Sequence, residues 1–531
     1  MRKQKTTTSA AVVLLVAFAI STLFGLLRDR LLYQYFFSCC AFQLDVYNAA
    51  FRIPDLLFRL LVTGALSAAF MPVFFEYWVK DKKQAYKLAS SLMAILGIAF
   101  FALGGLVIIF AQPISAIIAP GFDSEQISLM ARLTRVMIFA QGFFVLSSFS
   151  SGMLQAQKRF LLPALAPIIY NIFIILGIVL FSHSFGIFAP AFGVVIGAFG
   201  HFLIQFPALV SLGFRFELPK KILNKGTKKI LRLMLPRTLS LGLSEIESTL
   251  PVVLASLLPA GSLSLYYLAE HLYILPVRLI GVTLGQAVFP YFSNLWARNK
   301  YPLFKQKIIL SLRQVFYLTS FIASLLLVLR IPIVRLIFGS RQFPWEATVI
   351  TGRLIAFSIP AILSQAGIQI LARAFYALQD TRTTFYVSLV SLVINFILSL
   401  LGIYSFEWGI YSLVIALSVA GVFQLVSMYI ILMYKVNHFD IKTQLQVSFL
   451  VKLLLINSVS GFVAYVAMKF LDIRVFDTTR VIGLAFLTGV SSGCSLVVFL
   501  FLSHLLKLDV FQDIVRLVKF YAKPILSRRT P

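Results

Sequence analysis

The stretch that decides the fold lies between residues 22 and 78 and contains TLFGLLRDRLL (22–32) and LDVYNAAFRIPDLLFRLLVTGALSAAFMPVFFEYW (44–78). Its apolar segments carry charged residues at depths where a membrane helix normally has none: Arg28, Asp29, Arg30, Asp45, Arg52, Asp55 and Arg59. A charge at the centre of a bilayer costs at least ~2.5–3.5 kcal/mol on insertion scales, so such residues usually face a wet cavity. The stretch therefore predicts a polytopic membrane protein with a cationic internal cavity.

The composition of the whole chain agrees with this prediction. Of its 531 residues, 60% are hydrophobic and 12% are charged, whereas soluble proteins have roughly 25% charged residues. The net charge of +28 raises the question of nucleic acid. However, the basic residues lie in short gaps between apolar runs, which fits membrane topology and contact with anionic headgroups. We therefore expect membrane lipids as partners and no nucleic acid.

Apolar runs of about 20 residues, the length of one membrane span, occur about fourteen times. They begin at about residues 10, 45, 87, 127, 161, 188, 230, 262, 307, 347, 384, 409, 447 and 480. No gap between them is long enough for a soluble domain. The sequence predicts an all-α polytopic membrane protein with about fourteen transmembrane helices.

The gaps between these segments can be tested for orientation, because short cytoplasmic loops are enriched in Lys and Arg. Basic residues gather in alternate gaps, such as 80–87 and 215–232, and in the tail after Lys507. The other gaps, such as SCCAFQLD (38–45) and PGFDSEQ (120–126), have acidic residues or no charge. The exceptions are Arg335, Arg341 and Arg474. Both chain ends are therefore expected in the cytoplasm.

Two sequence matches at offsets near 220 indicate an internal duplication. Residues 65–78, ALSAAFMPVFFEYW, align with 283–296, TLGQAVFPYFSNLW, at an offset of about 218. Gln157-Lys158-Arg159 resembles the segment Gln379-Asp380-Thr381-Arg382. These matches predict two pseudo-symmetric six-helix lobes, with substrate at their interface. We expect an N-terminal lobe (1–213), a C-terminal lobe (214–440), two further helices (441–506) and a basic cytoplasmic tail (507–531).

Arg52, Asp55 and Arg59 are the strongest candidates for a binding site, since their spacing of i, i+3 and i+7 places them on one helix face. One interpretation is a self-neutralised structural cluster where helices pack. The other is a cavity wall that binds an anionic headgroup, because guanidinium groups bind phosphate through paired donors. Arg28 is the residue of the Arg28-Asp29-Arg30 run that we expect to point inward.

Further charged residues lie on the seventh and eighth expected segments. Glu245 and Glu247 are followed by Glu270 and His271. A buried glutamate can couple protons or pair with an arginine, and the histidine can titrate or form part of a cavity wall. No P-loop, HExxH, GxSxG or Cys/His metal spacing occurs, and Cys39, Cys40 and Cys494 fit no metal pattern. We predict a transporter, with no catalytic residues, metal or cofactor.

Several motifs together resemble one family. They are GLLRD (25–29), AFRIPDLLFRLL (50–61), GALSAAFMPVF (64–74), RFLLPALAPIIYN (159–171), ASLLPAGSLSLYYLAE (255–270) and LARAFYALQDTRTT (371–384). These motifs resemble the MurJ (MviN) family of lipid II flippases. The similarity runs from about residue 10 to about residue 440.

The resemblance implies a fourteen-helix fold of the multidrug/oligosaccharidyl-lipid/polysaccharide exporter superfamily in the bacterial inner membrane. Two six-helix lobes would flank a cationic cavity, and the last two helices (441–506) would form a groove for the lipid tail. The implied substrate is lipid II, undecaprenyl-diphosphate carrying the disaccharide-pentapeptide of peptidoglycan. It would be flipped to the outer leaflet by alternating access. Proteins of cell-wall synthesis or division are candidate further partners.

The family's charged positions are only partly kept. Arg28 and Asp29 match its helix 1 pair, and Asp45 matches its acid at the outer start of helix 2. Arg59 remains from a usual basic pair, while Glu270-His271 stands where an Asp-Arg pair is typical. From this resemblance we expect Arg28, Asp29, Arg52 and Arg59 to bind the substrate, and Asp45, Asp55, Glu270 and His271 to act as gating or charge partners.

Two alternatives to lipid II flipping stay open at this point. The first is an exporter of another polyprenyl-linked glycan or of a small amphiphilic drug. The second is a membrane glycosyltransferase, which would need a carboxylate in a substantial outer loop. The predicted outer loops are too short for that chemistry, so the transporter hypotheses are favoured.

Overall fold

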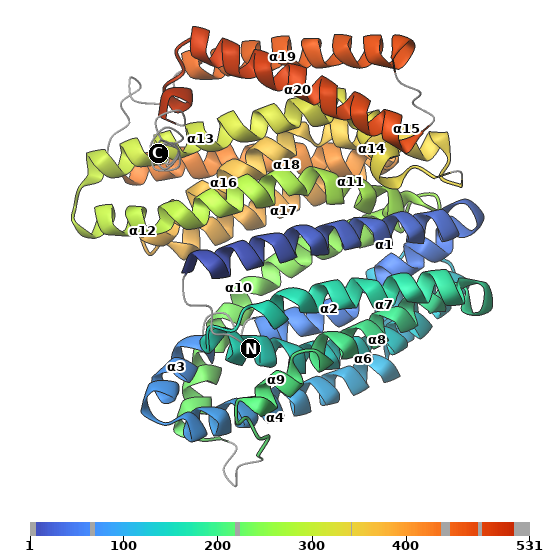
Figure 1. Cartoon of the computed structure of the whole chain (residues 1–531), viewed down its shortest axis with the longest axis vertical. Helices are drawn as coiled ribbons and strands as arrows, with labels where there is room; N and C mark the ends of the chain where they lie inside the picture. Colours follow the sequence, from blue (N-terminus) through green and yellow to red (C-terminus); the bar gives the residue numbers. More distant parts are fainter. Residues whose placement is uncertain are drawn as a thin grey trace, which may run out of the picture. The chain divides into compact units, whose positions relative to one another are not determined.

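The computed structural model describes residues 7–63, 70–217, 223–340, 342–436, 447–475 and 480–513, and throughout these ranges the regular elements are helices (Figure 1). Part of the first repeat motif (64–69), Lys220, Lys221, Arg341 and most of the expected tail lie outside the described residues. The chain forms two compact units, 1–264 with 337–344 and 265–336 with 345–531. The predicted division into lobes with boundaries at 213 and 440 stays a prediction.

The first unit contains these helices, of which α11 continues into the second unit: α1 (Thr7–Ala50), α2 (Arg52–Phe58), the π-helix η1 (Arg59–Thr63), α3 (Met71–Lys80), α4 (Lys82–Ile109), α5 (Ala111–Ile118), α6 (Ser124–Ala156), α7 (Leu161–Phe185), α8 (Phe188–Leu203), α9 (Phe206–Ser211), α10 (Lys225–Ala255) and α11 (Ser262–Pro276).

The second unit continues with these helices, of which α14 ends in the first unit: the π-helix η3 (Val277–Val282), α12 (Thr283–Ala297), α13 (Tyr301–Val328), α14 (Arg330–Phe338), α15 (Trp345–Phe357), α16 (Ile359–Ala377), α17 (Thr381–Tyr404), α18 (Tyr411–Lys435), α19 (Val447–Arg474) and α20 (Val481–Leu505).

The all-α prediction is confirmed, and its physical basis is the absence of water in the bilayer core. A helix satisfies its own backbone donors and acceptors there, whereas an open strand edge cannot. Among the described residues, ten helices are long and apolar enough to cross a membrane, or eleven if the bent pair α15 and α16 is one span. This is a multi-pass membrane protein, and the expected number of fourteen spans stays a prediction.

The 44-residue span labelled α1 consists of two helices. They meet at Cys40, where φ is −150° and ψ is 48°, so the backbone leaves the helical conformation there. Cys40 lies inside the expected gap at 38–45, so the predicted break between the first two helical segments is confirmed. The gap SCCAFQLD contains no proline or glycine, and the break is limited to this residue.

Close helix packing in the first unit depends on small residues. Helices α7 and α8 form an antiparallel pair, against which α1 and α6 also pack (Figure 1). A Cβ added at Gly177 of α7 would lie 2.8 Å from the carbonyl oxygen of Ala189, and one at Gly193 of α8 would lie 2.9 Å from the Cα of Ile174. Only a glycine lets these two backbones approach so closely, which is common between membrane helices.

The second unit is built around α16, which packs against α12, α13 and α18. Its fully buried side chains include Phe375, and Phe292 of α12 and Phe304 of α13 belong to the same cluster. Helices α19 and α20 pack on each other, and a second cluster joins them to α13 through Tyr317 of α13, Phe449 of α19 and Phe499 of α20. These two clusters hold the long helices of the unit in place.

Local backbone geometry recurs in the two parts of the chain that the sequence matches relate. The π-helix η1 begins at Arg59 and η3 begins at Val277, which is the offset of the first sequence match. Lys158 and Gln379 both have left-handed φ values, 60° and 59°, immediately before α7 and α17. A left-handed residue just after a helix is common, but π-turns inside helices are rare, so the recurrence of η1 and η3 supports the predicted duplication.

The two helix pairs that follow these turns are also alike. Gly186 and Gly409 have φ values of 53° and 55° where α7 and α17 have ended. A Cβ added at Gly402 of α17 would lie 2.5 Å from the Cβ of Ser412, just as one at Gly177 would meet Ala189. The packing of α17 on α18 therefore repeats that of α7 on α8.

Candidate substrate-binding site

The predicted cationic face lies at a break in a membrane helix. Helix α2 contains Arg52 and Asp55, and Arg59 is the first residue of the π-helix η1. Single π-turns inside helices are rare and occur frequently at functional sites. The side chain of Arg59 is 53% exposed, whereas that of Arg52 is 8% exposed.

Arg52 is held by α10. Its Nη2 donates to the Glu245 carboxylate at 2.6 Å, to the Glu245 backbone carbonyl at 2.7 Å and to Ser248 Oγ at 2.8 Å. Its Nε donates to Thr249 Oγ1 at 2.7 Å. Because a buried charge is tolerated where it is paired and hydrogen-bonded, these contacts explain how Arg52 stays inside an apolar helix bundle.

Glu245 joins the two arginines of this segment. Its Oε2 accepts from Arg52, and its Oε1 lies 3.8 Å from Arg59 Nη1. The carboxylate is buried, with a side-chain exposure of 6%. Of the two roles left open by the sequence, the structure therefore shows the arginine-partner role for Glu245. One anionic group already occupies the space between the two guanidinium groups.

Asp55, the acid of the predicted face, does not form an ion pair with either arginine among the contacts described. Its Oδ1 accepts from Nε2 of Gln141 on α6 at 2.8 Å. Gln141 is buried, so this bond ties α2 to α6 inside the first unit. Asp55 nevertheless adds a negative charge within one helical turn of both arginines.

Arg28 and Asp29 form a second charged cluster in the same unit. The Arg28 Nε and Nη2 donate to Asp29 Oδ1 at 2.9 and 2.7 Å, and its Nη1 donates to Asn171 Oδ1 on α7 at 3.2 Å. Adjacent helix residues do not share a face, but the long arginine side chain bends back across the helix to reach its neighbour.

Asp45 has a different environment from the arginine clusters. It is buried, and it accepts from the Gly261 amide at 2.6 Å and from the Ser264 amide and hydroxyl at 2.8 and 2.5 Å. These groups lie at the N-terminus of α11, where four amides have no partner within the helix. Tyr33 donates to the Ser264 carbonyl at 2.7 Å. Asp45 thus caps α11 and ties it to α1.

The structure does not bring all predicted site residues into one unit. Arg28, Asp29, Asp45, Arg52, Asp55 and Arg59 belong to the first unit, whereas Glu270 and His271 belong to the second. Glu270 is half-buried and His271 is exposed on α11. Arg30, which we did not assign to the site, donates to the Gly339 carbonyl at 2.7 Å.

Sequence reasoning missed several site residues that are uncharged. Ser248 and Thr249 orient Arg52, Gln141 binds Asp55, and Asn171 binds Arg28. Ser248 and Thr249 lie about one helical turn from Glu245, and this spacing could have indicated that they share its helix face. No spacing rule links Gln141 or Asn171 to partners 86 and 143 residues away.

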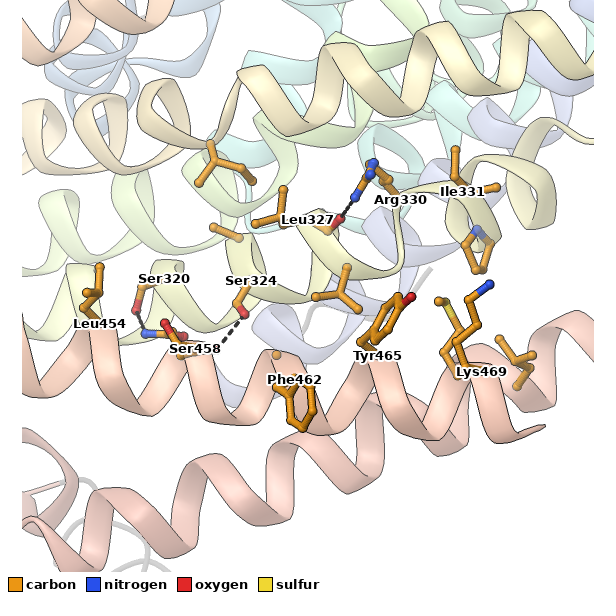
Figure 2. A pocket seen from close by; sticks show the side chains of 18 of the residues that line it. Ser320, Ser324, Leu327, Arg330, Ile331, Leu454, Ser458, Phe462, Tyr465 and Lys469 are labelled. Atoms are coloured by element: carbon orange, nitrogen blue, oxygen red, sulfur yellow. Dashed lines mark hydrogen bonds between the residues drawn. The ribbon is translucent and has the colours of Figure 1, made fainter. Parts of the chain in front are cut away.

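A pocket of about 1270 Å³ lies in the second unit, between α13, α14 and α16 on one side and α19 and α20 on the other. Most of its wall is apolar, with side chains such as Leu327, Leu454 and Phe462 (Figure 2). Asn457 of α19 donates to Ser320 Oγ at 3.0 Å, and Ser324 Oγ donates to the Asn457 carbonyl at 3.1 Å. These bonds join α19 to α13 along the pocket.

One end of this pocket is basic. Arg330, Arg335 and Lys469 line it together with Asp472, and Arg335 lies over the ring of Trp345 at 5.8 Å. Figure 2 shows Arg330 and Lys469 toward the same end of the pocket, away from Leu454. The arrangement suits a long apolar group with a negative charge at one end.

In the part of the chain that the structure describes, no group of three or more His, Cys, Asp or Glu side chains is arranged to hold a metal ion. The chemistry that the described residues offer is the binding of an anion by guanidinium groups and of an apolar chain by a lipid-sized pocket.

The fold and these clusters define a class: multi-pass helical membrane proteins with arginines paired to acidic side chains inside the helix bundle. The family model for "Lipid II flippase MurJ" matches residues 34–478 of this sequence. The chain therefore belongs to the MurJ family.

Curated relatives agree with this assignment. The probable lipid II flippase of Buchnera aphidicola subsp. Schizaphis graminum is 28% identical over 501 residues, which is 86% of this chain and 95% of that protein. The corresponding protein of Buchnera aphidicola subsp. Acyrthosiphon pisum is 31% identical, over 73% of this chain and 76% of its own length. The lipid II flippase of Burkholderia cenocepacia is 28% identical over 71% of this chain and 74% of its own.

Solved structures support the fold. A lipid II flippase in an inward closed conformation is similar with a TM-score of 0.74 and 24% identity, covering 95% of this chain and all of the other. An inward-facing multidrug transporter of the MATE family, in the MOP superfamily, has a TM-score of 0.66 and 14% identity over 81% of this chain and 98% of its own. These similarities show that the chain has the same helical fold as these two transporters.

Proposed function

We propose that this protein flips lipid II from the inner to the outer leaflet of the bacterial inner membrane, as a transporter and not an enzyme. The observation that carries the proposal is Glu245 between Arg52 and Arg59, at 2.6 and 3.8 Å. A carboxylate held by two guanidinium groups marks a place that also suits a diphosphate, because both anions are bound by paired N–H donors. Membership of the MurJ family agrees with this substrate.

In this proposal the remaining charged residues support the same transport cycle. Arg28 and Asp29 contribute to headgroup binding, and alternating access moves the headgroup through a cationic cavity. Asp45 and Asp55 hold helices in one state through their contacts with α11 and α6. Glu270 and His271 act as charge partners on α11.

We assign the lipid tail to the second-unit pocket beside α19 and α20, within the range 441–506 expected to form a groove. Its volume of about 1270 Å³ and largely apolar wall suit part of a polyprenyl chain (Figure 2). With both termini in the cytoplasm, α13 runs outward and the basic end of the pocket faces the outer leaflet. Arg335, an exception to the charge rule for loops, then lies near outer headgroups.

The division into two lobes, a tail groove and a basic cytoplasmic tail belongs to the same proposal, as do partners in cell-wall synthesis or division. The basic tail after Lys507 would lie at the cytoplasmic leaflet, whose anionic lipids attract such segments. A fluorophore placed at either terminus and tested for quenching from outside the cell would establish the topology.

The direct test is complementation of a bacterial strain depleted of its own flippase, with lipid II exposure measured by an external probe. Wild type should restore growth and surface-accessible lipid II. Arg59→Ala should restore neither, whereas Arg298→Ala, at an exposed position after α12, should restore both. Failure of the wild type, together with transport of a different polyprenyl-linked glycan or an amphiphilic drug, would favour the alternative exporter function.

A further inference from the structure

We infer that Glu245 is a built-in substitute for the substrate's diphosphate: it pairs with the Arg52 and Arg59 guanidinium groups and gives way when the anionic headgroup binds. This inference rests on the proposed function, since it describes how the same site is kept ready. It assigns a competing role to a residue of α10 that itself does not bind substrate.

The charge balance of the segment is the first argument. Arg52 and Arg59 contribute two positive charges, and Asp55 and Glu245 contribute two negative charges. The cluster is therefore neutral as it stands, which makes it tolerable inside a membrane protein. A diphosphate headgroup brings negative charge of its own, so it binds well only if one of the two carboxylates withdraws.

The hydrogen bonds around Arg52 show which carboxylate can withdraw. Besides the Glu245 carboxylate, Arg52 has three neutral acceptors: Thr249 Oγ1, Ser248 Oγ and the Glu245 backbone carbonyl, all within 2.8 Å. These acceptors belong to the body of α10 or to its short side chains. The Glu245 side chain can therefore rotate away while the guanidinium group stays in place with partners.

Arg59 is held less tightly by Glu245 than Arg52 is. Its Nη1 lies 3.8 Å from Glu245 Oε1, which is longer than a direct hydrogen bond, and its side chain is about half exposed. Guanidinium groups prefer paired, short bonds to phosphate oxygens. An incoming diphosphate can thus take Arg59 first and then displace Glu245 from Arg52.

A purely structural ion pair is the competing explanation, and it predicts the opposite result for one substitution. If Glu245 only stabilises Arg52, then Glu245→Gln weakens the site or leaves anion affinity unchanged. If Glu245 competes with substrate, the same variant binds a diphosphate more tightly, because Gln keeps a hydrogen-bond acceptor and loses the charge.

The experiment measures binding of farnesyl diphosphate and of uncharged farnesol to the full chain in nanodiscs. We expect Glu245→Gln to bind farnesyl diphosphate about tenfold more tightly than wild type, the size of one charge-assisted hydrogen bond exchanged. Farnesol binding should not change. Glu247→Gln is the matched control, because Glu247 is an exposed residue of the same helix and loses the same charge; its affinities should equal those of wild type.

A folding control keeps the result interpretable. The double variant Arg52→Gln with Glu245→Gln removes the pair as a whole, so it should remain folded in thermal unfolding and lose the gain in affinity. Unchanged or weaker diphosphate binding by a folded Glu245→Gln protein would overturn the inference. An equal gain for Glu247→Gln would also overturn it, since the effect would then come from general charge.

Failure of this inference can be told apart from failure of the proposed function. Binding of farnesyl diphosphate reports on the anion site alone, whereas external accessibility of lipid II reports on transport. Tighter binding in Glu245→Gln without lipid II transport by wild type would keep the competing role of Glu245 and reject lipid II as the substrate. Transport by wild type with no gain in affinity would keep the function and reject the role of Glu245.

Discussion

The segments 52–80 and 270–297 have the same backbone irregularity and different chemistry. Each segment contains a π-helix, η1 in the first and η3 in the second. Each π-helix precedes a helix with a proline at the equivalent position, Pro72 in α3 and Pro290 in α12. At the offset of the repeat, Arg52 corresponds to Glu270 and Arg59 corresponds to Val277. The comparison indicates that helix packing constrains the backbone of both copies, while the anion site depends on side chains that the copies do not share.

The largest expected effect is the removal of Arg52. Arg52→Ala leaves the Glu245 carboxylate buried without its main partner, which should cost about 3–5 kcal/mol of unfolding free energy and abolish complementation. Arg278→Ala makes the same chemical change in the exposed part of η3 and should cost at most about 0.5 kcal/mol. Chemical or thermal unfolding in detergent measures both.

Equal losses of unfolding free energy for Arg52→Ala and Arg278→Ala would contradict the comparison. The arginine of segment 52–80 would then have no special structural role. Stability recovered in Arg52→Gln with Glu245→Gln, without recovered complementation, would sharpen it. The arginine would then be required by the substrate and not by the fold.

The second prediction concerns the link between α1 and the start of α11. Asp45 accepts from the backbone amides of Gly261, just before α11, and of Ser264 in α11, and its counterpart in the second copy is Leu263. Asp45→Ala leaves both amides buried and unpaired, which should cost about 3 kcal/mol. Asp123→Ala removes an exposed cap of α6 and should cost about 1 kcal/mol, so thermal unfolding should separate the two variants clearly.

The third prediction exchanges residues between the copies. Thr63 of η1 corresponds to Gly281 of η3, and a Cβ at Gly281 would lie 2.9 Å from the Cα of Ala366 on α16. Gly281→Thr should therefore push η3 from α16 and cost about 2 kcal/mol. Gly97→Thr is the control, since a Cβ at Gly97 of α4 meets nothing within 4 Å. A tolerated Gly281→Thr, measured by thermal unfolding, would show that η3 does not need its close contact.

The sequence was sufficient to predict the helical membrane fold, because hydrophobic runs are local signals. The duplication stays a prediction, which the recurrence of the π-helices η1 and η3 supports. The sequence was not sufficient to predict the partner of each charge. Arg52 and Glu245 are 193 residues apart, and the alternatives for Glu245 could be separated only by the packing of α10 near α2 and η1. The contact of Arg28 with Asp29 depends on side-chain bending, which helix-face rules do not describe.

Boundaries were also harder to predict than elements. The polar gap at 38–45 predicted a break between two helices, and the structure limits that break to Cys40, with helix on both sides of it. The π-helices were not predicted, since a π-turn is a rare backbone state that no local residue pattern specifies. The orientation of the chain and the lobe boundaries remain predictions from charge and repeats.

The smallest expected effect concerns the turns before α7 and α17. Both contain a left-handed residue, but only the second has a side-chain cap among the described contacts: Asp380 accepts from the Thr383 amide at 3.0 Å and pairs with Lys435. Burial acts to raise the pKa of Asp380, but the hydrogen bonds from Lys435 and Thr383 outweigh it and lower the pKa to about 2.

Asp380→Ala should cost about 1 kcal/mol of unfolding free energy at neutral pH. Because the folded pKa lies below the unfolded value of 3.8, this contribution is complete above about pH 4 and is lost as the pH falls toward 2. The free energies of unfolding of wild type and Asp380→Ala should therefore differ by the same amount at pH 6 and pH 8 and become equal in acid. The control is Lys158→Ala, in the turn without a cap, whose difference from wild type should not disappear in acid.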